Sequence, residues 1–258
     1  MTAHLGVDLG ATWLRACLSD GKRPLWEERE RAPAWQDAPG VLRRMLRRRG
    51  LKRVAALTLG GTRLGGRSER AELAKRLRPL SARVKVMTDF ELAYAAAFGS
   101  GPGILLVAST GSIAYARDRR GKSRRAGGLG PLFGDEGSGF WLGKRATLDR
   151  PLRRRLGLPA PLDLARARDP VRATAALAPK ILRSTSTGAR RLREEAAAHL
   201  AALALESARG LRLPEPVALA LHGSLFQNAA LRRAVLKRLG RVKIVVPRLR
   251  AERAAAGL

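Results

Sequence analysis

Short apolar runs alternate with glycine-rich and polar turns through the first part of the chain, a pattern that predicts β-strands. The predicted strands comprise residues 4–8, 13–19, 25–31, 54–59 and 84–88. Amphipathic or alanine-rich stretches predict helices over residues 41–49, 69–77 and 90–98. Strands and helices are therefore interleaved from the start of the chain.

The second part of the chain repeats the strand signal and then becomes mostly helical. A strand, turn, strand unit around residues 106–115 precedes a glycine-rich loop over residues 127–139. Helices are expected over residues 139–148, 163–168, 170–182, 188–209 and 228–239, and strands over residues 217–221 and 242–246. The apolar run 251–257 is short for a closing helix.

This order of elements predicts an α/β protein in two lobes with a ligand cleft between them. We place the first lobe at residues 1–88 and the second, which carries the helical insertion, at residues 89–248. Residues 249–258 are a candidate last helix of the first lobe.

Two turns in the chain have similar sequences and resemble copies of one structural motif. Gly10-Ala11-Thr12 and Thr110-Gly111-Ser112 each link two predicted strands, and Thr12 and Ser112 are 100 residues apart. Such turns bring backbone N–H groups and hydroxyls together, so a pair of them can hold the phosphates of one nucleotide. Asp8 beside the first turn would repel phosphate unless a cation such as Mg²⁺ lay between them. The alternative for either turn alone is an ordinary β-hairpin.

The segment 127–143 is the most distinctive in the chain, because adjacent acids, Asp135 and Glu136, lie among many glycines just before a predicted helix. Glycines allow close backbone approach, which favours a polar ligand site. The alternative is a flexible surface loop whose acids favour the positive end of the helix.

Asp89 follows a predicted strand, where α/β proteins usually place reactive groups. A carboxylate there could accept the proton of a sugar hydroxyl as its oxygen attacks phosphorus. The position suits an N-cap of the next helix equally well.

Composition narrows these alternatives. The chain has 258 residues and a formal net charge of +30, from 51 basic and 21 acidic residues. The arginines are spread evenly without interleaved aromatics, which favours a solvated basic surface over a nucleic-acid site. Cys17 is the only cysteine and there are three histidines, so a disulfide framework or a metal cluster is not expected. No apolar run approaches the ~18 residues of a membrane span, and we expect a cytoplasmic protein.

Four segments in this order carry a resemblance to a known family. They are Asp8-Leu9-Gly10-Ala11-Thr12, Ser109-Thr110-Gly111-Ser112, Gly134-Asp135-Glu136-Gly137-Ser138 and Leu221-His222-Gly223-Ser224-Leu225-Phe226. Together they resemble the BadF/BadG/BcrA/BcrD ATPase family, and in particular its N-acetylglucosamine kinase-like branch. That family belongs to the sugar kinase, Hsp70 and actin superfamily, so the resemblance implies two ribonuclease-H-like lobes.

The resemblance also implies roles for individual residues. It implies an ATP-dependent kinase of an amino sugar such as N-acetylglucosamine or glucosamine, using Mg²⁺, with a homodimer as a candidate assembly. ATP phosphates would be bound by Gly10, Ala11, Thr12, Thr110, Gly111 and Ser112, and adenosine by Gly223, Ser224 and Asn228. The sugar would contact Asp89, Ser112, Gly128 and Asp135, with Asp89 as the catalytic base and Asp8 near the metal.

Ala11 and Ser109 depart from the family pattern, which commonly has glycine at both positions. Two other functions remain open on the sequence. One is an ATPase of the same fold that energises or controls a partner, although such relatives hold an iron–sulfur cluster through cysteines. The other is a basic nucleic-acid-binding protein.

Overall fold

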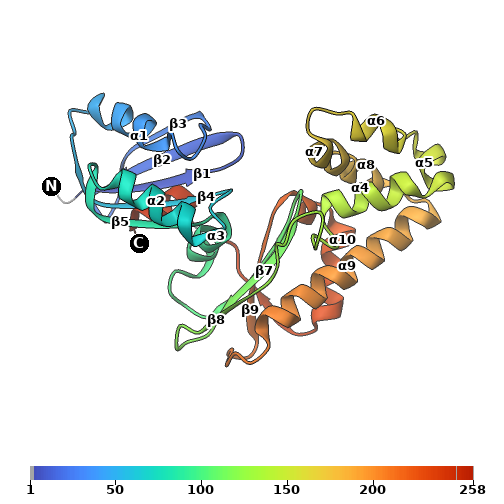
Figure 1. The fold of residues 1–258 in the computed structure, drawn as a ribbon. Helices are drawn as coiled ribbons and strands as arrows, with labels where there is room; N and C mark the ends of the chain where they lie inside the picture. Colours follow the sequence, from blue (N-terminus) through green and yellow to red (C-terminus); the bar gives the residue numbers. More distant parts are fainter. Residues whose placement is uncertain (1–2, 248, 258) are drawn as a thin grey trace. The chain divides into compact units, whose positions relative to one another are not determined.

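Two five-stranded sheets with the same topology form the framework of this computed structural model, which describes residues 3–247 and 249–257 (Figure 1). The chain divides into unit 1, residues 1–100 and 247–258, and unit 2, residues 101–246. The predicted α/β fold class is confirmed.

Unit 1 contains the sheet β3-β2-β1-β4-β5. Its strands are β1 (His4–Leu9), β2 (Trp13–Ser19), β3 (Pro24–Arg31), β4 (Val54–Gly61) and β5 (Ser81–Thr88). Strands β1, β2 and β3 form an antiparallel meander, while β4 and β5 pair parallel to β1 and to each other. The helices are α1 (Ala38–Arg47), α2 (Arg67–Leu77), α3 (Asp89–Phe98) and α11 (Ala251–Gly257).

Unit 2 repeats this arrangement. Its strands are β6 (Gly103–Ala108), β7 (Ser112–Arg117), β8 (Ser123–Gly127), β9 (Val217–His222) and β10 (Val242–Ile244). Strands β6, β7 and β8 form the antiparallel meander, and β9 and β10 continue parallel to β6. Strand β6 is therefore the counterpart of β1, and β7 of β2, which places the two similar turns at equivalent points of the two sheets.

The helices of unit 2 lie mainly between β8 and β9. They are α4 (Gly139–Leu148), α5 (Arg150–Leu156), α6 (Pro161–Ala165), α7 (Pro170–Ala175), α8 (Ala178–Arg183) and α9 (Thr187–Ala208). A 3₁₀ turn, η1 (Ser224–Gln227), and α10 (Ala229–Leu239) follow β9. The four short helices α5 to α8 gather beside α4 (Figure 1).

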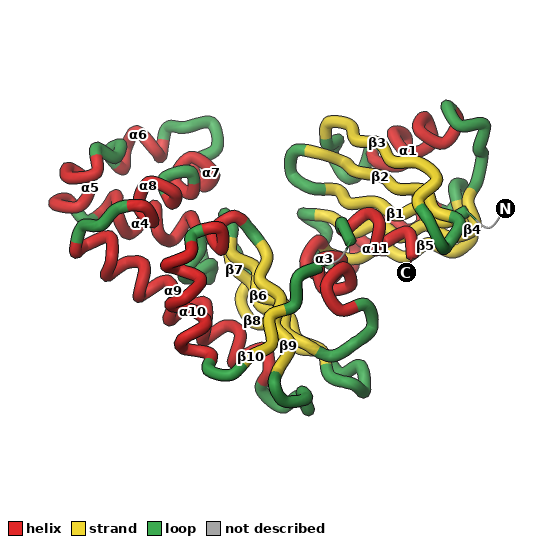
Figure 2. The backbone as a smooth tube through the Cα atoms, turned by 180° about the vertical axis from the view of Figure 1, so that it is seen from behind, coloured by secondary structure: helices red, strands yellow, loops and turns green. Residues whose placement is uncertain are grey.

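The division into units differs from the predicted boundary at residue 88. Helix α3 follows that boundary but belongs to unit 1, because it packs against β4, β5 and α11 and its Leu92 shares a buried cluster with Met87 and Ala255. Helix α11 packs on β1 and β2, and Figure 2 shows it beside α3 on the sheet of unit 1.

Each unit has its own apolar core. Leu5, Val7 and Leu57 represent the core of unit 1, whereas Leu106, Leu142 and Leu200 represent that of unit 2. Within the described residues, no helix is both long enough and apolar enough to cross a membrane.

Candidate nucleotide site

The turn between β6 and β7 is held in place by the first residues of α4. The Gly139 N–H donates to the Ser109 carbonyl at 2.7 Å, and the Phe140 N–H donates to the Thr110 carbonyl at 3.1 Å. Within the turn, the Ser109 N–H donates to the Gly111 carbonyl at 2.9 Å. These bonds use the turn's carbonyls internally and leave the exposed Thr110 side chain at its tip.

Asp135 supports the same turn through a buried carboxylate. Its Oδ1 accepts a hydrogen bond from the Ser112 N–H at 3.1 Å. A Cβ at Gly111 would lie 2.8 Å from that oxygen, so only glycine fits there without a shift. Burial raises the pKa of Asp135, although the Ser112 N–H acts in the opposite direction. The carboxylate therefore shapes the turn.

The predicted sugar-contacting residues Ser112, Gly128 and Asp135 form one network. Ser112 is buried and is the first residue of β7; its hydroxyl donates to the Glu136 carbonyl at 2.8 Å. The Gly128 N–H donates to the Ser112 carbonyl at 2.9 Å. The amide and hydroxyl hydrogens of Ser112 are thus engaged within the protein, and Gly128 is the exposed member of the three.

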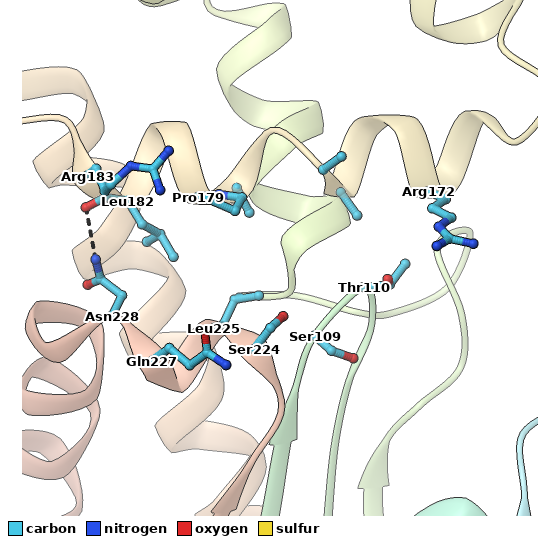
Figure 3. A pocket seen from close by; sticks show the side chains of 13 residues that line it. Ser109, Thr110, Arg172, Pro179, Leu182, Arg183, Ser224, Leu225, Gln227 and Asn228 are labelled. Carbon is cyan, nitrogen blue, oxygen red and sulfur yellow. Dashed lines mark hydrogen bonds between the residues drawn. The ribbon is translucent and has the colours of Figure 1, made fainter. Parts of the chain in front are cut away.

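A cavity of about 440 Å³ opens beside this turn (Figure 3). Its walls come from the turn, from α7 and α8, and from η1 with the residue after it. The lining residues are Ser109, Thr110, Arg172, Ala175, Ala176, Ala178, Pro179, Leu182, Arg183, Ser224, Leu225, Gln227 and Asn228. Thr110, Ser224 and Asn228, all predicted nucleotide ligands, therefore line one cavity.

Gly223 makes the tight connection between β9 and η1. Its φ angle is 102°, and a Cβ there would lie 2.3 Å from the Ala108 carbonyl oxygen. Glycine is required both by the left-handed backbone and by the close approach to β6. Gly223 thus sets where Ser224 lies against the β6–β7 turn.

Asn228 braces the opposite wall of the cavity. Its Oδ1 accepts the Leu231 N–H at 2.9 Å and caps α10, while its Nδ2 donates to the Leu182 carbonyl at 3.2 Å (Figure 3). The side chain joins the start of α10 to the end of α8. One hydrogen of the Nδ2 amide remains for a ligand.

The turn between β1 and β2 in unit 1 is one residue longer than its counterpart. Residues 10–13 separate the paired Leu9 and Leu14, whereas residues 109–111 separate Ala108 and Ser112. The Gly10 N–H donates to the Trp13 carbonyl, and the Thr12 carbonyl accepts the Ala32 N–H, both at 3.0 Å. Ala11, where the family pattern has glycine, is exposed at the tip.

Asp8 lies on β1 just before this turn, opposite Arg15 on β2. The Arg15 guanidinium contacts Oδ2 of Asp8 at 3.0 Å. Burial raises the pKa of Asp8; Arg15 lowers it, and the charges of Glu252 and Asp89 raise it further. Asp89 and the buried Glu252 therefore lie close enough to Asp8 within unit 1 to act on its carboxylate.

The donor set around Asp8 fits a nucleotide-bound Mg²⁺. No group of three or more His, Cys, Asp or Glu side chains among the described residues could hold a metal ion alone. Mg²⁺ at phosphate sites needs only one or two carboxylates because phosphate oxygens and water complete its shell. With Arg15 on Oδ2, Asp8 still has Oδ1 for this purpose.

Asp89 is the first residue of α3, and its carboxylate is exposed. The N-cap is Thr88, whose hydroxyl accepts the Glu91 N–H at 3.2 Å, while the Glu91 carboxylate accepts the Thr88 N–H at 2.8 Å. The alternative prediction that Asp89 caps α3 is therefore wrong. Oδ1 of Asp89 accepts the Phe90 N–H at 2.9 Å.

The sequence analysis did not identify Arg172 and Arg183, the charged residues of the cavity. One reason is that it predicted a single helix over residues 170–182, whereas the chain bends at Ala176 and Leu177 between α7 and α8. Pro179 in the first turn of α8 was the available signal, because proline inside a helical pattern marks a break or a new start.

The repeated sheets and the turn-bordered cavity define an actin-like ATPase fold. The fold of this chain is similar to that of a ROK hexokinase from Thermus thermophilus. The TM-score is 0.63 at 19% identity, and the match covers 99% of this chain and 97% of that one. A candidate N-acetylglucosamine kinase from Chromobacterium violaceum is more similar, with a TM-score of 0.75, 27% identity, and coverage of 99% and 98%.

The chain belongs to the BadF/BadG/BcrA/BcrD ATPase family, whose model matches residues 5–257. It is also 42% identical over 64 residues to an N-acetylmuramic acid/N-acetylglucosamine kinase from Clostridium acetobutylicum. That match spans 25% of this chain and 21% of the relative. The predicted family membership is confirmed.

Proposed function

We propose that the protein is an ATP-dependent kinase that phosphorylates a hydroxyl of an amino sugar of the N-acetylglucosamine or glucosamine type. The observation that carries the proposal is the cavity of unit 2, which is lined by Thr110 of the β6–β7 turn together with Ser224 and Asn228. Kinases of amino sugars among the similar proteins support this choice of acceptor.

In this proposal, adenosine occupies the cavity beside Gly223, Ser224 and Asn228, and the turn with Thr110 and Gly111 binds ATP phosphates. The turn with Gly10, Ala11 and Thr12 is a second proposed phosphate-binding element. Ser112 acts mainly by fixing the turn, since its N–H and hydroxyl are bonded to residues 135 and 136. Asp8 holds Mg²⁺, which when bound neutralises charge on the phosphate oxygens.

Asp89 is the proposed catalytic base. The sugar hydroxyl oxygen attacks the γ-phosphorus, the bond from that phosphorus to the bridging oxygen of ADP breaks, and the hydroxyl proton passes to the Asp89 carboxylate. Its exposure and its fixed place at the start of α3 suit this task. Ser112, Gly128 and Asp135 form the proposed acceptor side.

Cys17 supports a kinase over a partner-activating ATPase with an iron–sulfur cluster. The only cysteine of the chain lies on β2 with 1% of its surface exposed. Burial raises the pKa of its thiol to about 11, which disfavours the thiolate that ligates iron.

The test measures ADP release across a panel of amino sugars, muropeptide-derived sugars and neutral hexoses. For an accepted sugar, Asp89→Asn should lower kcat by about 10²-fold or more while ATP still binds, because a positioned base contributes that much. Asp37→Asn is a matched control, since Asp37 precedes α1 in the same unit and makes no side-chain cap bond.

Two results would contradict the proposal in different ways. Full turnover by the Asp89→Asn variant would contradict the role of Asp89 as catalytic base but not the kinase activity. Absence of sugar-dependent ADP release from the unaltered protein across the whole panel would contradict the kinase activity itself.

A further inference from the structure

The cavity of unit 2 has two ends with a cation at each. Figure 3 shows Arg172 extending from α7 toward the side where Thr110 lies, whereas Arg183 lies beside Leu182 and Asn228. The other lining residues are uncharged. The same cavity therefore offers a matched pair of arginines, one beside the turn and one at the far wall.

Helix α4 fixes Arg172 relative to the turn. Its N–H groups at Gly139 and Phe140 hold the Ser109 and Thr110 carbonyls. One helical turn further on, Gly143 lets α7 approach so closely that a Cβ there would lie 2.0 Å from the Thr174 carbonyl oxygen. Since α4 contacts both segments, Arg172 and Thr110 keep a defined spacing.

The neighbourhood of Arg172 leaves its guanidinium available. Asp169, the nearest acid along the chain, accepts the Arg172 backbone N–H at 3.0 Å and caps α7. Within the described part of the chain no ion pair involves the Arg172 side chain, which is exposed. In so basic a chain, many arginines have no acidic partner. Arg172 is therefore a candidate ligand-binding residue because of its position in the cavity and not because of its charge alone.

The turn beside Arg172 has few N–H groups left for a ligand. The Ser109 and Ser112 N–H groups and the first N–H groups of α4 are already donated within the protein, which leaves those of Thr110 and Gly111. A charged donor beside these two N–H groups therefore strengthens the binding of an anionic ligand. A guanidinium matches phosphate oxygens with paired hydrogen bonds.

We propose that Arg172 binds the polyphosphate of the nucleotide at the Thr110 end of the cavity and makes the site select nucleoside di- and triphosphates over the nucleoside. The inference rests on the proposed function, because it takes adenosine to fill the rest of the cavity. Arg183 contacts the nucleoside end and makes no phosphate contact.

The experiment measures the binding of adenosine, ADP and ATP to the full-length protein by calorimetry without Mg²⁺. Arg172→Ala should weaken ADP and ATP binding by about 10- to 100-fold, the loss expected for hydrogen bonds to a charged group, and leave adenosine binding unchanged. Arg172→Lys should recover part of the loss, because a lysine keeps the charge without the paired geometry. Arg183→Ala should change adenosine and ATP binding by the same factor.

Each outcome decides a separate point. Equal losses for adenosine and ATP in Arg172→Ala, or no loss for either, would overturn the role of Arg172. Binding of ATP without any sugar-dependent turnover would overturn the kinase and leave the arginine result standing. An unaltered protein that binds neither ADP nor ATP would overturn both. Unfolding curves of the variants show whether the fold survives each substitution.

Discussion

At the residue scale, the carboxylate of Asp135 fixes the shape of the β6–β7 turn at the candidate site. Asp135 adopts a φ of 64°, which is strained for a residue with a side chain, and points its buried carboxylate at Gly111 and Ser112. Strain and buried charge both cost stability, and they are tolerated where a site needs a fixed shape. The shape of the turn is therefore maintained at the expense of stability.

The pH dependence of the free energy of unfolding of the Asp135→Asn variant tests this cost. Burial raises the pKa of folded Asp135 above its ordinary 3.8, so the folded protein holds this proton more tightly than the unfolded chain does. As pH rises from the unfolded to the folded pKa, the wild type loses stability relative to a variant with no proton to lose. We expect Asp135→Asn to gain free energy of unfolding over the wild type as pH rises from ~3 to 7.

Denaturant unfolding at several pH values measures this difference. Asp20→Asn is a control of opposite sign, because hydrogen bonds from the Arg23 and Lys22 backbone lower the pKa of Asp20. That variant should lose stability relative to the wild type as pH rises. A difference for Asp135→Asn that does not change with pH would contradict a burial penalty at this carboxylate.

The candidate site residues came from two kinds of signal in the sequence. Thr110 could be singled out because glycine and hydroxyl residues in turns follow local rules, whereas Gly223 and Ser224 were named through the family resemblance. Ser112 was predicted as a phosphate ligand, but its donors face residues 135 and 136, a pairing set by tertiary folding. In the sequence Arg172 could not be distinguished from the many other arginines, because its place beside the turn depends on the packing of α7 against α4.

At the element scale, the close packing of α11 on β1 depends on one glycine. A Cβ at Gly6 would lie 2.1 Å from the Glu252 carbonyl oxygen and 2.3 Å from the Ala256 nitrogen. Both are backbone atoms, so α11 could not avoid the clash by a rotamer change. The glycine thus fixes the distance between the helix and the sheet.

Gly6→Ala should therefore destabilise the protein by about 3 kcal/mol, at the upper end of the usual cost of overpacking. Gly40→Ala in α1 is the matched control, because its added Cβ meets no atom within 4 Å. That substitution should stabilise by about 0.5–1 kcal/mol, the usual gain for alanine over glycine in a helix. Chemical denaturation measures both, and a Gly6→Ala variant as stable as Gly40→Ala would refute the packing argument.

Elements with a clear apolar period were predicted well, and those formed by pairing or breaks were not. The long helix predicted over residues 188–209 corresponds to α9 (Thr187–Ala208). Strand β8 went unpredicted because Arg124 and Arg125 are exposed on this edge strand, and it forms by pairing with β7. The bounds of α5 could not be predicted from an apolar period, because this helix with its run of three arginines buries only Leu152.

At the scale of the whole molecule, the duplicated topology was visible in the sequence only through the two turns. Their separation of 100 residues matches the equivalence of β1–β2 and β6–β7. The boundary was harder to predict, because α3 follows a strand end in the sequence but packs within unit 1. Unit 1 is also discontinuous, because α11 near the end of the chain belongs to it, the arrangement expected for residues 249–258.

This discontinuity predicts different behaviour for the two units in isolation. Residues 101–246 contain a complete sheet, their own core and every residue that lines the cavity. A fragment of these residues should unfold cooperatively and bind adenosine with the affinity of the full chain. Residues 1–100 lack α11, so the surface of β1 at Gly6 loses its cover and the fragment should not unfold cooperatively.

Joining residues 247–258 to the 1–100 fragment through a flexible Gly/Ser linker should restore cooperative unfolding, because it returns α11 and the buried Ala255 to their contacts. The same linked fragment with Gly6→Ala should fail, since the added methyl occupies the place of the α11 backbone. Thermal unfolding by circular dichroism compares the three fragments. Cooperative unfolding of residues 1–100 alone would mean that α11 adds stability to a lobe already complete without it.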